Sequence, residues 1–255
     1  LLTFKTEIMA STSETGHAIN VVNFETIISD VASYGATYNP SKASLKLKAL
    51  HLQLDAAKTA INGVSEAEPA YKLAINAREA AFKTLSPLIT KVINALKASD
   101  TTEQVQESAQ TLVRKIQGRR ATPKKTEEEK KQAAESGKEI VEISSSQMSH
   151  DSRIENFDKF IKLLSSIAEY APNETDLKTT ALTSLLSELK AKNSAVTNAE
   201  IPLTNARIAR NEVLYKANTG MVDTALDVKT YIKSIFGATS PQYKKISKIK
   251  FTKPR

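Results

Sequence analysis

The stretch NFETIISDVASYGATYNPSKASLKLKAL, residues 23–50, is repeated later in the chain as NFDKFIKLLSSIAEYAPNETDLKTTAL, residues 156–182. The two copies align at an offset of 133 and then, after one residue is dropped, at an offset of 132. The aligned pairs include Phe24 with Phe157, Ile28 with Ile161, Tyr38 with Tyr170, Leu45 with Leu177 and Leu50 with Leu182. Most of these shared positions are apolar and recur at helical spacing. The repetition predicts a duplicated helical fold.

The composition of the 255-residue chain also favours helices. It contains only 7 Gly, less than half of the usual share of about 7%, and aromatic residues make up 5%. Its cores must be built from Leu, Ile, Val and Ala, which suits helices packed on helices. We expect an all-α protein with two tandem antiparallel helical bundles that are joined by a charged linker.

Each copy is expected to form a set of antiparallel helices, at residues 18–34, 41–63, 66–84, 86–98 and 102–117 in the first copy and at 152–169, 174–195, 200–216, 221–235 and 240–250 in the second. Asn173 with Asp176, and Ser86 before Pro87, have the character of helix starts. KANTGM, residues 216–221, predicts a break at the position that corresponds to Ser86 and Pro87.

The apolar stripe on the second helix favours a bundle over a coiled coil, because it spans only about three heptads and is met by short loops. Its members are Leu45, Ala49, Leu50, Leu54, Ala57, Ile61 and Val64.

The predicted domains are a disordered N-terminus at 1–14, a first bundle at 15–117, a charged linker at 118–147, and a second bundle with a basic tail at 148–255. Residues 1–8 precede Met9, which has the context of a translation start, so they are expected to be foreign to the native protein. Pro123, a block of charges and a run of Ser mark the linker. Within it, residues 126–139 are a candidate helix and residues 140–143 a candidate extended piece.

The net charge of +8 is concentrated in two runs that supply twelve positive charges, which leaves the rest of the chain at −4. The first run consists of Arg114, Lys115, Arg119, Arg120, Lys124 and Lys125, and the second of Lys244, Lys245, Lys248, Lys250, Lys253 and Arg255. Such runs are candidate sites for an anionic partner, whether nucleic acid, membrane surface or acidic protein. They are also typical of a solvated linker and of a solvated tail that keeps a protein soluble. Tyr243, Ile246 and Ile249 are spaced for one helix face, a pattern shared by membrane-surface helices and by terminal helices docked on a core.

Motifs for catalysis are not evident in the sequence. The chain has 3 His and no Cys, and it lacks a Gly-rich phosphate loop, a nucleophile elbow and a zinc-type His pair. His17 and His150 occupy equivalent positions, which favours a role in the fold over metal binding. Arg78 and Arg210 are also equivalent. Each arginine could bind an anionic ligand, or it could have a structural role, either in an ion pair or with its aliphatic stem packed over apolar surface. We therefore expect no catalytic residue, metal, cofactor or small-molecule substrate.

The absence of Cys allows a reducing compartment. Residues 1–16 do not have the pattern of a secretory signal, and no apolar run approaches the length of a membrane helix. These observations predict a cytoplasmic protein.

Several phrases carry a resemblance that covers nearly the whole chain from Thr15 on. They are TGHAINVVNFE, YGATYNPSKASLKLKAL, VRKIQGRRA, SQMSHDSRIENFDK, NARIARNEVLY and VDTALDVKTYIKSIFGATSPQYKKISKIKFTKP. The chain resembles a family of uncharacterised bacterial proteins that are duplicated, all-helical and without an assigned activity. The resemblance implies a bacterial source and offers no catalytic residues to carry over.

Together these features predict a non-catalytic helical scaffold or binding protein, with a protein partner or a second copy of the chain as the expected partner. The alternative is a nucleic-acid-binding protein that uses the basic segments 114–125 and 244–255.

Overall fold

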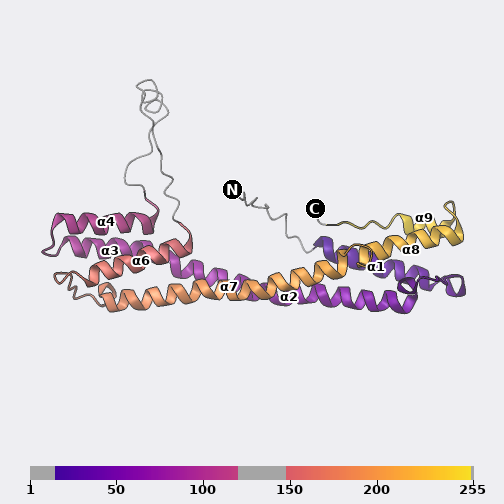
Figure 1. Ribbon diagram of the computed structural model, residues 1–255, viewed down its shortest axis with the longest axis horizontal. Coiled ribbons are helices and arrows are strands. Elements are labelled where there is room, and N and C mark those ends of the chain that lie inside the picture. Colours follow the sequence, from indigo (N-terminus) through magenta and orange to yellow (C-terminus); the bar gives the residue numbers. More distant parts are fainter. Residues whose placement is uncertain (1–14, 120–147, 254–255) are drawn as a thin grey trace, which may run out of the picture. The chain divides into compact units, whose positions relative to one another are not determined.

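The structure is a computed structural model that describes residues 15–119 and 148–253, and every regular element in these two stretches is a helix (Figure 1). This confirms the all-α class. The elements are α1 (Thr15–Ala32), the 3-10 turns η1 (Gly35–Thr37) and η2 (Ala43–Leu45), α2 (Leu47–Lys83), α3 (Leu85–Lys97), α4 (Glu103–Gln117), α6 (His150–Ser165), the 3-10 turn η3 (Thr175–Leu177), α7 (Thr179–Tyr215), α8 (Met221–Phe236) and α9 (Pro241–Ser247).

The described helices form two compact units, each with its own apolar core. Unit 1 contains α1, α2 up to Ala70, α7 from Glu200 onward, α8 and α9. Its core gathers Phe24 and Ile27 from α1, Leu50 from α2, Val228 from α8 and Ile246 from α9, all fully buried. Burial of one such side chain contributes about 1.5–3 kcal/mol, so these contacts between distant segments hold the unit together.

Unit 2 contains α2 from Tyr71 onward, α3, α4, α6 and α7 up to Ala199. Phe157 and Phe160 from α6 are fully buried against Leu85 and Ile89 of α3 and Ile116 of α4. The core of this unit therefore joins segments that are far apart in the sequence, as the core of unit 1 does.

Each unit draws on both halves of the chain. Unit 1 takes its first helical hairpin from the first half and its last helices from the second half, and unit 2 takes them the other way round. This grouping differs from the predicted bundles at 15–117 and 148–255. It arises because α2 and α7, at 37 residues each, begin in one unit and end in the other.

Both long helices pass through a proline. The predicted breaks at 63–66 and 195–200 are wrong, since α2 continues through Pro69 and α7 through Pro202. A proline inside a helix removes one hydrogen bond and costs about 3 kcal/mol. The flanking segments are rich in Ala, Leu, Glu and Lys and pack into the two cores, and these contributions outweigh that local cost. The apolar stripe predicted on α2 is confirmed, with Leu50, Leu54 and Val64 buried.

The turn before each long helix is built in the same way in both units. Tyr38 Oη donates a hydrogen bond to the Leu45 carbonyl oxygen at 2.6 Å, and Tyr170 Oη donates to the Leu177 carbonyl oxygen at 2.8 Å. These bonds hold the preceding residues in a 3-10 turn, so the long helices begin later than the predicted residues 41 and 174. Asn173 lies within the turn and is not a helix cap.

Most of the other helix boundaries lie within about two residues of the predicted ones, but α1 begins at Thr15 rather than 18, α6 ends at Ser165 rather than 169, and α9 ends at Ser247 rather than 250. The break at 216–220 is confirmed, and α8 begins after Gly220. Helix α3 begins at Leu85 with Thr84 at its N-cap position, so Ser86 lies inside the first turn and is not the cap. The two candidate segments of the linker, 126–139 and 140–143, lie outside the described residues, as do residues 1–14.

Candidate functional site

The described part of the first basic run lies at the end of α4 in unit 2. Arg114 and Lys115 occupy the last turn, where positive charge is favoured by the helix dipole. Arg114 is half-buried, whereas Lys115 and Arg119 are exposed. The remaining members of the run, Arg120, Lys124 and Lys125, lie outside the described residues.

The second basic run begins on α9 and continues into a tail that is docked on unit 1. Ile246 is fully buried and anchors α9. The Asn20 side chain on α1 donates to the Thr252 carbonyl oxygen at 2.7 Å and accepts from the Thr252 N–H at 3.0 Å. Asn23 donates to the Lys250 carbonyl oxygen at 2.8 Å. The backbone of this segment is thus fixed by specific hydrogen bonds.

Two lysines of this docked tail face carboxylates. Lys245 Nζ lies 2.5 Å from Asp30 Oδ1, and Lys253 Nζ lies 2.6 Å from Asp223 Oδ1. The hydrogen bond from Lys253 lowers the pKa of Asp223, and the hydrogen bond to Asp30 raises the pKa of Lys245. The side chains of Lys244, Lys248 and Lys250 are exposed, and Arg255 lies outside the described residues. The described members of the two basic runs belong to different compact units and do not converge within either one.

The two equivalent histidines each contact an aromatic ring at the end of a long helix. His17 Nδ1 lies 2.5 Å from Tyr215 Oη, with the ring centroids 5.5 Å apart. His150 packs edge-on against Phe82, with the centroids 4.6 Å apart at 87°. Burial lowers the pKa of His150, and the positive charges of Arg78 and Arg153 lower it further. These contacts are consistent with the role in the fold that was predicted for both histidines.

The guanidinium groups of Arg78 and Arg210 both bond asparagine side chains. Arg78 Nη1 donates to Asn193 Oδ1 at 3.2 Å. Arg210 is only 5% exposed, and its Nη2 donates to Asn211 Oδ1 at 2.8 Å. Each arginine thus contributes to packing and hydrogen bonding inside its own unit.

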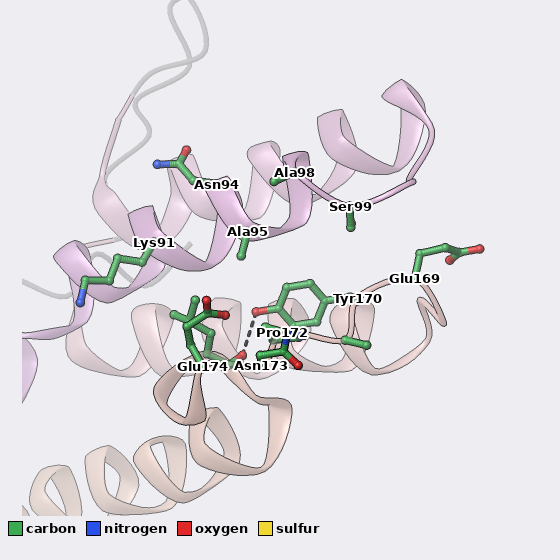
Figure 2. A pocket seen from close by; sticks show the side chains of 12 residues that line it. Lys91, Asn94, Ala95, Ala98, Ser99, Glu169, Tyr170, Pro172, Asn173 and Glu174 are labelled. Atoms are coloured by element: carbon green, nitrogen blue, oxygen red, sulfur yellow. Dashed lines mark hydrogen bonds between the residues drawn. The ribbon is translucent and has the colours of Figure 1, made fainter.

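Sequence reasoning missed a pocket of about 550 Å³ in unit 2, between α3 and the turn that follows α6 (Figure 2). Its lining consists of Lys91, Asn94, Ala95, Ala98 and Ser99 on one side and residues 169–174 with Leu177 on the other. The Tyr170 ring lies at the centre, and the Ala95 side chain points toward it (Figure 2). Tyr170 is 7% exposed, so the ring is a largely buried part of the lining.

Acidic groups dominate the electrostatics around Tyr170. Burial raises the pKa of Tyr170 to about 12, with further contributions from the negative charges of Asp176 and Glu174. Lys91 Nζ lies 3.7 Å from Asp176 Oδ2, which offsets part of this negative charge. The pocket combines one aromatic ring, several amide and hydroxyl groups, and a negative rim.

The sequence did contain a signal for this pocket. Ala95 on α3 occupies the position that Tyr231 occupies on α8, so a bulky aromatic residue in one copy faces a small residue in the other. The residue pairs matched between the two copies end at Arg78 with Arg210, so the helices at 86–98 and 221–235 correspond as elements but Ala95 and Tyr231 are not paired.

Within residues 15–119 and 148–253, no group of three or more metal-ligating side chains lies close enough to hold a metal ion. In the same part of the chain, no helix combines the length and apolar character needed to cross a bilayer. Comparisons with protein-family models, with curated proteins and with solved structures gave no match to the chain.

Proposed function

We propose that the protein is a non-catalytic helical scaffold or binding protein that presents apolar helix surface to a protein partner or to a second copy of itself. The observation that supports this proposal is a pair of exposed apolar residues on α7. Ile201 and Ile208 are 55% and 62% exposed, and a spacing of seven residues places them on one face of the helix.

This exposed face is separate from the part of α7 that supports the fold. Leu203 and Leu214 on the same helix are almost completely buried. Because the buried residues already pack the helix into unit 1, Ile201 and Ile208 are not needed to close a core. Contiguous exposed apolar surface is typical of interaction sites, whereas apolar residues exposed singly are ordinary.

A second exposed pair lies on α1 in the same unit. Ile19 and Val22 are 52% and 59% exposed and are three residues apart, so they also share a helix face. Phe24 and Ile27 on the opposite side of α1 are fully buried. Unit 1 therefore offers apolar surface on two of its helices in addition to its closed core.

The geometry favours this function over nucleic-acid binding through segments 114–125 and 244–255. Lys245 and Lys253 already face Asp30 and Asp223, which reduces the positive charge that the tail offers to phosphates. A gel-shift titration tests the alternative. Tight binding at low salt that falls steeply as salt rises would favour the nucleic-acid function.

The proposed function is tested by placing two charges on the exposed face of α7. We expect the double variant Ile201→Lys and Ile208→Lys to lose self-association in light scattering, or to lose binding to its partner protein in pull-downs, while keeping the helical circular dichroism of the wild type. The matched control is Thr183→Lys with Ser187→Lys, because both residues are exposed on α7 outside the apolar pair. Unchanged association of the isoleucine variant would contradict the proposal.

A further inference from the structure

The pocket beside Tyr170 has a filled counterpart in unit 1, and the two helices α3 and α8 show the correspondence. Their buried residues coincide at an offset of 136, as Leu85 with Met221, Ile89 with Ala225, Val92 with Val228 and Leu96 with Ile232. Helix α3 contacts η3 in unit 2, and α8 contacts η2 in unit 1. At the same offset, Ala95 corresponds to Tyr231.

Tyr231 occupies space in unit 1 that is open in unit 2. Its ring packs edge-on against Tyr38, with the centroids 5.4 Å apart and the planes at 82°. Tyr38 and Tyr170 make the same hydrogen bond to the turn, so the two rings are held equivalently. With Ala95 in place of Tyr231, unit 2 lacks the second ring, and the pocket lies beside Tyr170 at this position. The molecule thus shows which chemical group fits against this tyrosine.

The charges beside the two sites are reversed. In unit 1, Lys42 Nζ lies 2.5 Å from Asp227 Oδ2. Their counterparts in unit 2 are Glu174 and Lys91, at the offsets of 132 and 136. Because Lys91 also faces Asp176 at 3.7 Å, the rim of the pocket carries more negative than positive charge. Figure 2 shows Glu174 beside the Tyr170 ring, whereas Glu169 points outward.

We infer that the pocket beside Tyr170 binds a small aromatic amine, with its ring edge-on to Tyr170 and its ammonium group beside Glu174. Edge-to-face packing of aromatic rings contributes about 0.5–1.5 kcal/mol beyond the burial of area. The volume of about 550 Å³ falls within the range of about 300–1,000 Å³ that is typical of ligand sites. This inference concerns unit 2 and is independent of the function proposed for the apolar faces of unit 1.

Phenethylamine is the probe for this site, and hydrocinnamate is its counterpart with a carboxylate in place of the amine. We expect phenethylamine to shift the amide resonances of residues that line the pocket in the full chain, with a dissociation constant in the millimolar range for a ligand of about nine non-hydrogen atoms. Glu174 is exposed, so we expect hydrocinnamate to bind about threefold to fivefold more weakly at low salt. The difference should shrink as salt rises.

The deciding variant is Ala95→Tyr, which supplies the ring that unit 1 already has. We expect it to weaken phenethylamine binding at least about tenfold, because the side chain occupies the site. Ser187→Tyr is the matched control, since Ser187 is exposed on α7 and does not line the pocket, and it should bind as the wild type does. Equal binding by the wild type and Ala95→Tyr, or no saturable binding by the wild type, would overturn the inference.

A reciprocal variant keeps the inference testable if Ala95→Tyr does not fold. Tyr231→Ala removes the ring from unit 1 and is expected to create a second site beside Tyr38, seen as new shifts at residues of η2 and α8. Lys42 takes the place of Glu174 there, so the second site should prefer hydrocinnamate over phenethylamine. A second site without this reversed preference would contradict the role assigned to the rim charges. If no second site appeared at all, the inference that the Tyr231 ring marks the place of the ligand ring would be contradicted.

Discussion

Tyr38 and Tyr170 occupy equivalent positions in the two copies, but their surroundings and their roles differ. Each hydroxyl group donates to the carbonyl oxygen of a leucine seven residues later, and this bond fixes the turn before a long helix. Tyr38 is covered by Tyr231, whereas Tyr170 borders the pocket. The same hydrogen bond therefore closes a core in unit 1 and forms part of a candidate binding site in unit 2.

Replacing either tyrosine with phenylalanine is expected to destabilise the protein. Tyr38→Phe leaves the Leu45 carbonyl oxygen without its donor in a closed environment and should lower the free energy of unfolding by about 1–3 kcal/mol. Tyr170→Phe should cost less, because water entering through the pocket can bond the Leu177 carbonyl oxygen. Urea unfolding followed by circular dichroism measures both values. An equal or larger loss for Tyr170→Phe would contradict this account of the pocket.

Alkaline pH provides a separate check on Tyr170. Its pKa is raised to about 12, so the folded state favours the neutral phenol. The resulting stability is fully present below the unfolded pKa of about 10 and is lost as pH rises through the folded value. We expect the stability of the wild type to fall between about pH 10 and pH 12, with a smaller fall in Tyr170→Phe.

His150 should make unit 2 sensitive to acid. Burial, Arg78 and Arg153 lower its pKa, so the folded state favours the neutral ring. The stability that this provides is present above the unfolded pKa of about 6.5 and is lost as pH falls through the folded value. His150→Phe keeps a ring against Phe82 and should show a shallower loss of stability below about pH 7. Thr183→Phe, at an exposed site on α7 in the same unit, is the control and should keep the slope of the wild type.

At the level of whole elements, α2 and α7 form because packing at both ends outweighs an unfavourable residue in the middle. Pro69 lies two residues before Tyr71, the first residue of α2 that belongs to unit 2. Pro202 lies two residues after Glu200, the first residue of α7 that belongs to unit 1. A proline in this position removes a backbone hydrogen bond without ending the helix. The two long helices are thus locally weak where each leaves one core for the other.

Pro69→Ala is therefore expected to stabilise α2. The substitution restores an N–H group that can bond the Ser65 carbonyl oxygen, and it removes the clash of the ring with the preceding turn. We expect an increase of up to about 3 kcal/mol in the free energy of unfolding, measured by urea denaturation. Pro202→Ala should act in the same direction on α7. If both variants were less stable than the wild type, the prolines would be required for the native paths of these helices.

At the level of the whole molecule, neither half of the chain contains all the helices of either unit. Phe24 of the first half packs in one core with Val228 and Ile246 of the second half, and Phe157 of the second half packs with Ile89 of the first. An isolated half would expose these residues to water. Because each unit takes helices from both halves of the chain, the two halves depend on each other for burial of their apolar surfaces.

Separate expression of residues 15–119 and 148–255 tests whether the two halves depend on each other. Each fragment alone is expected to be poorly folded or to pair with a second copy of itself, because its apolar surfaces lack their partners. Mixing the two should yield a stable one-to-one complex with a cooperative thermal transition. Light scattering and circular dichroism measure both properties. If each fragment were a stable, cooperatively folding monomer, the compact units would instead follow the halves of the chain.

The helical class, the matched apolar positions of the two copies and most helix ends could be predicted from the amino-acid sequence alone. These features depend on local properties such as low Gly content, the spacing of Leu and Ile, and the break at 216–220. Local reasoning was wrong at Pro69 and Pro202, because the packing that carries a helix through a proline comes from distant residues. The predicted helix starts at residues 41 and 174 were too early for a similar reason. The hydrogen bonds of Tyr38 and Tyr170 that hold the preceding residues in a turn are not evident from the local sequence.

Two features could not be predicted in this way and depend on how the helices pack: which helices share a core, and where a pocket opens. The repeated segments have nearly interchangeable apolar faces, so the sequence pattern is satisfied whether each half packs on itself or on the other. The choice depends on the length and continuity of α2 and α7, which carry α3 and α8 into the opposite units. The pocket has the same origin, because the difference between Ala95 and Tyr231 has no consequence until both helices are placed against equivalent tyrosines.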